Sequence, residues 1–383
     1  MNDFEEYIRQ SEPDKQERAY AWQTAIGLQA VDGLKTSDYL KDTAYKHIEG
    51  DITIDEAREL IKSYYQSKSN REPDEDEMRE ADTVSANITK ILSTRTLDFT
   101  TNGYVSLHRR IFDGVFKFAG RIRDYDIAKK EWVLDGDTVN YLNWEDLRRA
   151  IDYDLEQERN FSYAGLSADE MIKHITHFVS NLWQIHAFGE GNTRTTAVFT
   201  IQYLRSIGFD VNNNLFADHS WYFRNALVRA NYKNVKKGID YTPIYLERFF
   251  RNLLLGDDWE LRNRYLHINA TGEWSEQPNT NRTSTGQVQG KHRTSAAQVE
   301  NVSIETKNLI RTVGQEQLSV KAIMERMQLK GRDNFLNRYL KPALGSGYIA
   351  LLYPNTPRHS RQKYFLTEKG LALLNELIKN EVR

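Results

Sequence analysis

One nine-residue stretch, His186 to Arg194, separates two segments that have a helical pattern. Apolar residues recur at three- and four-residue spacing from Met171 to Ile185 before the stretch, and from Ala197 to Leu204 after it. Two glycines and an asparagine interrupt this periodicity, so we predict a helix, a tight loop and a second helix. The first backbone N–H groups of the second helix would then point out of the loop. A helix start of this kind favours an anion, because its N–H groups are unpaired and its dipole is positive there.

Three reactive side chains accompany the predicted anion site. His186 has an imidazole whose ordinary pKa lies near ~6.5, which suits a proton acceptor at neutral pH. Glu190 supplies a carboxylate of the kind that a hard cation such as Mg²⁺ prefers. Arg194 supplies a forked guanidinium that can clamp a phosphate. We expect Phe188 to face the opposite way and to anchor the loop in the core.

The stretch resembles the signature of the Fic family, whose core reads H-x-F-x-[DE]-G-N-x-R, and every chemically active position of that core is filled here. The resemblance implies a mainly α fold, a Fic-type helical bundle with a short β-hairpin flap. It also implies transfer of AMP from ATP to a protein hydroxyl, with His186 as the general base and Glu190 holding Mg²⁺. The residues expected to bind ATP are Gly189, Gly191, Asn192, Thr193 and Arg194.

Two positions depart from the full family pattern. Thr193 stands where a glycine is usual, and Ala197 stands where the family carries a second arginine. That arginine would hold the γ-phosphate, so its loss leaves room for a different donor or a different transferred group. A Fic-fold phosphotransferase or another phosphate-group transferase is therefore the first alternative function.

Residues 1–70 resemble the small antitoxin-like helical module that accompanies some Fic proteins. In that module an S/T-x-x-x-E-G helix places its glutamate on the second arginine and blocks productive ATP binding. The preferred matching frame here is Leu28 to Gly33, where Asp32 replaces the glutamate; a second frame, Tyr45 to Gly50, keeps Glu49. The simpler interpretation of Asp32-Gly33 is a helix-ending turn.

The predicted catalytic domain covers residues 71–265. The acidic, Ser- and Asn-rich segment 67–82 is interpreted as a solvated linker or loop. Residues 118–134 alternate apolar and polar side chains after a glycine turn and resemble the flap, a hairpin that would dock the hydroxyl-bearing target protein by main-chain pairing. We interpret His108, on a preceding helix, as a packing histidine.

An aromatic-rich helix is expected from Ser220, with Trp221 and Phe223 in the core. The comparable helix of the Fic fold lies near the nucleotide base. Four of its polar residues are therefore candidates for contact with ATP as well as for structural roles. These four are Asn225, Arg229, Asn231 and Tyr232.

A composition rich in Thr, Asn, Ser, Gln and Gly marks residues 266–300 as a flexible linker. Residues 301–383 carry 14 Lys and Arg against 7 Asp and Glu, a net charge of +7. Three helices followed by two strand-like runs resemble a winged helix-turn-helix domain. Contact with DNA, docking of a protein and homodimer formation all remain open for it. Its candidate contact residues are Arg332, Asn334, Asn337 and Arg338 on the predicted recognition helix, and Arg358, His359, Arg361 and Lys363 on the wing.

The composition of the whole chain favours a protein of the cytoplasm. There is no cysteine for a disulfide or a thiolate metal site, and the formal net charge is only −2. The N-terminus is acidic and polar, unlike a signal peptide, and the apolar runs fall short of the ~20 residues that span a bilayer. The second alternative function is a DNA-binding regulator with a degenerate Fic sensor domain; the intact His186, Glu190 and Arg194 argue against it.

Overall fold

A computed structural model shows two compact units, Met1–Arg282 and Thr283–Arg383. Each unit is described by itself. The residues that the structure describes are 4, 7–8, 12–67, 73–94, 96–209, 211, 214–270, 304–314, 316–327, 329, 335–345, 347–352, 362–367, 369–371, 373–374 and 377.

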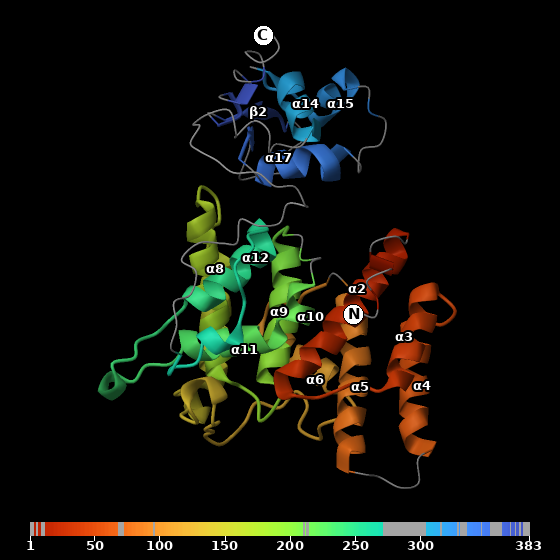
Figure 1. Ribbon diagram of the computed structural model, residues 1–383, viewed down its shortest axis with the longest axis vertical. Helices are drawn as coiled ribbons and strands as arrows, with labels where there is room; N and C mark the ends of the chain where they lie inside the picture. Colours follow the sequence, from red (N-terminus) through yellow and green to blue (C-terminus); the bar gives the residue numbers. More distant parts are fainter. Residues whose placement is uncertain are drawn as a thin grey trace, which may run out of the picture. The chain divides into compact units, whose positions relative to one another are not determined.

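The described part of the first unit is built from helices joined by turns and irregular segments (Figure 1). Its α-helices are α2 (Pro13–Gly27), α3 (Asp38–Glu49), α4 (Ile54–Ser67), α5 (Pro73–Leu92), α6 (Thr101–Ile111), α7 (Leu147–Asn160), α8 (Ala168–Ile185), α9 (Asn192–Ser206), α10 (Leu215–Asp218), α11 (Ser220–Ala230) and α12 (Ile244–Leu255). Short 3₁₀ turns are η1 (Leu28–Asp32), η2 (Trp132–Leu134), η3 (Trp144–Asp146), η4 (Val235–Lys237) and η5 (Asn263–Tyr265). The mainly helical class and the helix–loop–helix around residues 186–194 are confirmed.

Helix α9 lies at the centre of this unit. Every residue from Asn192 to Leu204 is buried, and the helix contacts α8, α6, α5 and η1. A helix that is enclosed on all sides needs no polar face, which is why its sequence lacks a strong amphipathic pattern. Because its first turn is part of the signature loop, the loop is fixed to the most buried element of the unit.

The N-terminal helices pack on α5 (Figure 1). They have a small core of their own, which includes Trp22 and Ile48 and also takes Ala86 from α5. Helix α2 contributes Ala25 to the main core at the same time. Residues 1–70 therefore belong to the same compact unit as the helices that follow, and a domain boundary at residue 70 stays a prediction.

The predicted linker 67–82 is wrong over its second half. Helix α5 begins at Pro73, and residues 73–82 are helical. Proline suits the first turn of a helix, and Asp74, Glu75 and Asp76 complement the positive end of the helix dipole there. The acidic cluster that we interpreted as a solvated linker is a helix start.

In the segment predicted as a hairpin, residues 118–134, the chain reverses its direction but forms no β-strands. Glu131 N–H donates to the carbonyl of Asp137 at 2.9 Å, and Gly136 N–H donates back to the Glu131 carbonyl at 3.0 Å. Residues 121–131 are irregular, with a bend at 124–125 and no strand pairing, and Trp132–Leu134 forms a 3₁₀ turn. Apolar and polar side chains do alternate here, but the backbone N–H and C=O groups of the segment do not pair with each other as two strands. We call residues 118–143 the cover segment.

The second unit has its own core and contains the only strands among the described residues. Its elements are α14 (Ile304–Val313), α15 (Val320–Arg326), the π-helical η6 (Leu336–Leu340), α17 (Lys341–Gly345), β1 (Ile349–Leu351) and β2 (Tyr364–Leu366). The strands pair antiparallel with Ile349 opposite Leu366, as expected for a wing. In the described part of the chain, no helix is both long and apolar enough to cross a membrane.

Most of the candidate residues for contact with DNA or protein lie outside the described residues. This holds for Arg332 and Asn334, for the wing residues Arg358, His359 and Arg361, and for the side chains of Asn337 and Arg338. Residues 271–300 of the predicted linker lie outside them as well.

Candidate functional site

Two left-handed residues define the loop between α8 and α9. His186 ends α8 with φ 50°, and Gly191 precedes α9 with φ 76°. A side chain on Gly191 would collide with the ring of Phe112, so glycine is required there for space as well as for φ. A non-glycine residue in the left-handed region costs roughly 1–2 kcal/mol. The fold tolerates that cost at His186, and strain of this kind is concentrated at functional sites.

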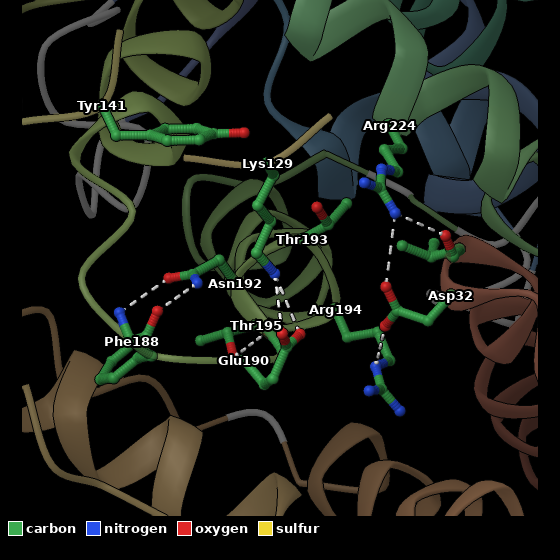
Figure 2. Close-up of polar contacts among 12 residues, drawn as sticks. Asp32, Lys129, Tyr141, Phe188, Glu190, Asn192, Thr193, Arg194, Thr195 and Arg224 are labelled. Carbon is green, nitrogen blue, oxygen red and sulfur yellow. Dashed lines mark hydrogen bonds and ion pairs between the residues drawn. The ribbon is translucent and has the colours of Figure 1, made fainter. Parts of the chain in front are cut away.

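The side chain of Asn192 closes the loop from within. Its carbonyl oxygen accepts from Phe188 N–H at 2.9 Å, and its amide donates to the Phe188 carbonyl at 2.6 Å (Figure 2). Thr193 is also engaged, because its hydroxyl accepts from the indole of Trp183 at 2.9 Å. The side chain of Asn192 is therefore committed to the loop, and the groups that remain for a ligand at these two positions are the backbone N–H groups and the hydroxyl hydrogen of Thr193.

Phe188 lies in the core, as predicted, and stacks on His108 with ring centroids 3.8 Å apart. Nδ1 of His108 accepts from Gly120 N–H at 2.8 Å, so its Nε2–H donates to the Glu190 carbonyl at 3.0 Å. Burial lowers the pKa of His108 to about 4, which keeps the ring neutral. His108 is thus a structural link between the cover segment and the loop, and the packing interpretation is confirmed.

The imidazole of His186 is almost completely buried, with 3% of its surface exposed. Its ring lies 4.0 Å from that of Tyr141 and meets Trp183 edge-on. Within the described residues, neither ring nitrogen has a hydrogen-bond partner. Burial and then the positive charge of Lys129 hold the pKa of His186 well below its usual range, so the ring is neutral at physiological pH. The ring nitrogen that carries no hydrogen can therefore accept a proton.

Glu190 lies beside His186 in the loop but faces outward, with half of its side chain exposed. Its two oxygens accept from the ammonium of Lys129 at 3.0 and 3.1 Å (Figure 2). Within the described residues, no group of three or more His, Cys, Asp or Glu side chains could hold a metal ion alone. One exposed carboxylate that already attracts a cation fits Mg²⁺, which is commonly held by one or two carboxylates together with substrate phosphates and water.

Arg194 is buried and surrounded by acceptors. Its Nε lies 2.8 Å from a carboxylate oxygen of Asp32, and one terminal nitrogen donates to Glu80 at 2.7 Å. The other terminal nitrogen donates to Gln29 at 3.0 Å. The expected phosphate clamp is therefore occupied by two carboxylates in this structure.

Of the two sequence frames compared with the antitoxin-like motif, the preferred one, Leu28 to Gly33, places its acidic residue against the signature. Asp32 contacts Arg194 and lies 3.5 Å from a second arginine, Arg224 (Figure 2). Glu49, from the other frame, pairs with Lys15 at the surface. Asp32 also ends η1 before Gly33, which has φ 73°, so the turn interpretation and the contact with the signature are both correct.

Arg224 and Glu131 are site residues that the sequence interpretation missed. One terminal nitrogen of Arg224 donates to both carboxylate oxygens of Glu131, at 3.0 and 3.1 Å, and the carboxylate is buried. The pair joins the cover segment to α11. No local pattern identifies it, because the two residues lie 93 positions apart in the sequence.

Arg123 was missed as well. Its Nε–H donates to the His186 carbonyl at 2.8 Å, and its backbone N–H donates to the Ala187 carbonyl at 3.0 Å. Further N–H groups of its buried guanidinium donate to the carbonyls of Tyr125 and Leu142. Arg123 thereby ties the cover segment to the loop that carries His186. The Gly-Arg-Ile-Arg run at 120–123 was the available signal, but it gives no indication that the second arginine is buried.

The four polar candidates of α11 and the residues after it have structural partners. Asn225 donates to Asn263 at 2.7 Å, and Arg229 donates to the Leu266 carbonyl and to Thr242. Asn231 donates to Ser180, and Tyr232 donates to Asp137 at 2.7 Å. These bonds fasten α11 to α8 and to neighbouring loops. The structural role that we left open is the one these contacts support.

Comparison with known proteins agrees with this geometry. Residues 98–204 match the Fic/DOC family, and residues 305–367 match the C-terminal domain of the Fic-like proteins described as filamentation induced by cAMP. The chain is 25% identical over 179 residues to the protein adenylyltransferase VbhT of Bartonella schoenbuchensis, a match that covers 43% of this chain and 36% of VbhT. It is 26% identical over 170 residues to the probable protein adenylyltransferase y4lH of Sinorhizobium fredii, covering 41% of this chain and 79% of that protein.

Solved structures of Fic proteins are more distant. A Fic family protein from Desulfovibrio desulfuricans G20 is 16% identical, with a TM-score of 0.39 and coverage of 92% of this chain and 88% of that one. BepC of Bartonella tribocorum, solved with bound AMPPNP, is 17% identical, with a TM-score of 0.35 and coverage of 48% and 88%. The chain therefore contains a Fic/DOC domain at residues 98–204 and a Fic-like C-terminal domain at residues 305–367.

Proposed function

We propose that the protein is a protein adenylyltransferase, which moves AMP from ATP to a Ser, Thr or Tyr hydroxyl of a target protein. The observation that carries the proposal is the buried, neutral His186, whose ring nitrogens have no partner among the described residues and which lies in the loop at the start of α9. The two curated relatives are named as adenylyltransferases, one of them as probable. The matched region spans 36% of the length of VbhT.

His186 is the general base of the proposed reaction. The target hydroxyl oxygen attacks the α-phosphorus of ATP, and its proton passes to a ring nitrogen of His186. The bond between the α-phosphorus and the bridging oxygen breaks, and pyrophosphate leaves. Glu190 would hold Mg²⁺, which supplies charge neutralisation at the phosphates when bound. The backbone N–H groups at the start of α9 bind phosphate oxygens.

Arg194 has to change partners before it can take part. A phosphate group can replace the carboxylates of Asp32 and Glu80, because both carboxylates are themselves partly exposed. The cover segment would align the target hydroxyl from above the loop, since Arg123 fixes it to the His186 carbonyl.

Labelled ATP tests the proposal. The protein is incubated with ATP labelled at the α or the γ phosphate, alongside His186→Ala and the control His177→Ala, an exposed histidine on α8. Label from the α position on protein, retained in the control and lost in His186→Ala, is the expected result. Label from the γ position alone sinks the proposal in favour of phosphotransfer.

One observation favours phosphotransfer as the second candidate. Ala197 is fully buried where the family carries a second arginine, so a triphosphate lacks that contact and could bind in another orientation. The same labelling experiment separates the two reactions.

A further inference from the structure

Lys129 lies outside the family signature but contacts a residue of the signature. It belongs to the cover segment, 61 positions away from Glu190 in the sequence, yet its ammonium lies within 3.1 Å of both Glu190 oxygens. Its charge also acts on the imidazole of His186. Figure 2 shows the side chain extending toward Glu190 beside the first turn of α9. A lysine ammonium thus lies beside the start of α9, where phosphates would bind.

The backbone of Lys129 is held on both sides. Its N–H donates to the Thr138 hydroxyl at 3.2 Å. Two positions later, Glu131 is fixed by its buried ion pair with Arg224, and six positions earlier Arg123 is fixed to the loop. The backbone of Lys129 is therefore fixed, while its long side chain can move the ammonium between nearby partners. Its entropy cost on binding a ligand is smaller than that of a lysine on a free loop.

The signature offers few unpaired cations for the negative charges of a triphosphate, and Lys129 could supply one. Ala197 removes one arginine of the family pattern, and Arg194 is paired with Asp32 and Glu80. A triphosphate brings several negative charges to the loop. In the ion pair between Lys129 and Glu190 the carboxylate side chain is 51% exposed and the lysine side chain 26% exposed. Ion pairs that solvent reaches are worth only about 0–1 kcal/mol, so the ammonium can exchange this partner for a phosphate at small cost.

We infer that Lys129 is a nucleotide-phosphate ligand of this site. The inference rests on the proposed function. Without nucleotide, its ammonium neutralises Glu190. When Glu190 takes up a divalent cation with the nucleotide, the ammonium passes from the carboxylate to the β- and γ-phosphate oxygens of the donor. Lys129 thereby supplies, from the cover segment, positive charge that the second arginine of the signature supplies in the family pattern.

Calorimetric binding of nucleotides to the full chain tests the inference. The probes are AMPPNP and AMP, each with excess Mg²⁺, and the variants are Lys129→Gln, Lys129→Arg and the matched control Lys130→Gln, an exposed neighbour. We expect Lys129→Gln to weaken AMPPNP roughly tenfold to a hundredfold, as for loss of a charge-assisted hydrogen bond, and to leave AMP within about threefold. Lys129→Arg should restore most of the loss, and Lys130→Gln should match the wild type.

Several outcomes overturn the inference. One is an unchanged AMPPNP affinity in Lys129→Gln, including the case in which only the KM for the target protein rises. Another is an equal loss for AMPPNP and AMP, which would indicate general damage to the site; a melting temperature equal to that of the control confirms that the variant is folded. If the wild type binds AMPPNP and the Lys129 effect appears but no label moves from the α-phosphate, the proposed function fails while the inference stands. If the wild type binds no nucleotide, both fail.

Discussion

At the scale of single residues, His186 carries the clearest chemical information. A buried polar atom without a partner normally costs about 1–3 kcal/mol, so each such atom calls for a structural or functional explanation. His186 has two such atoms within the described residues, and its backbone lies in the left-handed region. A side chain held under both penalties is better explained by a ligand-binding role than by packing.

The lowered pKa of His186 predicts the pH dependence of transfer. An ordinary histidine loses half of its neutral form at about pH 6.5. Burial and the charge of Lys129 shift the pKa of His186 below that value, so the base-competent form persists as the pH falls. We expect kcat/KM for label transfer to stay flat from about pH 7.5 to 6. The measurement is initial rate against pH, with His177→Ala as the control. A wild-type profile that halves near pH 6.5 would contradict the assignment of the burial effect to the catalytic group.

Loss of the proposed base should lower activity at every pH. His186→Ala is expected to lower the rate by roughly 10²–10⁴-fold, the usual contribution of a general base.

At the scale of elements, α5 joins the N-terminal helices to the catalytic centre. Its buried Asp82 accepts from the backbone and hydroxyl of Ser37, the N-cap of α3, and from the hydroxyl of Tyr65 on α4. Two residues before Asp82 on the same helix, Glu80 accepts from Arg194 of α9 at 2.7 Å. Deleting residues 1–70 would therefore disrupt buried contacts of α5 as well as any restraint, so point variants are the cleaner test.

Removing the carboxylate of Asp82 should destabilise the first unit. Asp82→Ala leaves the hydroxyls of Ser37 and Tyr65 without this acceptor, and loss of a buried charged acceptor costs about 3 kcal/mol or more. Urea unfolding followed by circular dichroism at fixed pH measures the effect. The exposed Glu77→Ala on the same helix is the control, and an equal midpoint for the two variants would argue against a structural role for the network.

Removing the carboxylates that pair with Arg194 should change nucleotide affinity and the thermal stability of the protein in opposite directions. Asp32→Asn removes one negative charge from the phosphate site, so we expect tighter Mg²⁺–AMPPNP binding, by several-fold. Adding Glu80→Gln should tighten binding further, yet lower the melting temperature without nucleotide, because Arg194 is left buried without a carboxylate. Calorimetry and thermal melts measure both quantities.

Glu49→Gln is the control for that pair, since Glu49 lies in the same N-terminal helices and pairs with Lys15 at the surface. Weaker nucleotide binding in Asp32→Asn would show that Asp32 supports the site instead of restraining it.

At the scale of the whole molecule, the two units have separate cores. The second core includes Leu309, Ile323 and Phe335, and the division of the chain falls at residue 282. A chain with two cores of this kind need not unfold in one step. The catalytic signature lies entirely within the first unit.

A cavity in the second core should therefore spare nucleotide binding. Ile323→Ala empties a fully buried position and is expected to cost about 2–5 kcal/mol. We expect an earlier unfolding transition for the second unit, with the Mg²⁺–AMPPNP affinity unchanged. The exposed Lys321→Ala is the control, and a matching loss of affinity in Ile323→Ala would show that the units are coupled.

Local chemistry explains what the sequence could predict. The helical periodicity on both sides of residues 186–194, the glycine before α9 and the buried Phe188 follow from neighbours within a few positions. The same reasoning failed at residues 73–82, where acidic side chains suit a helix start as well as a solvated linker. It also overestimated residues 118–134, because alternation of side chains cannot reveal where the backbone hydrogen bonds go.

The sequence by itself determined which residues are the candidate base, the candidate metal-binding carboxylate and the candidate anion-binding helix start, since these depend on residue type and short-range spacing. Only the tertiary structure decided how they are surrounded. Glu80 meets Arg194 across 114 residues, and Lys129 meets Glu190 across 61. Ion pairs of that range depend on how helices and segments pack, which no local pattern encodes. The charges that hold Arg194 and neutralise Glu190 are therefore properties of the fold.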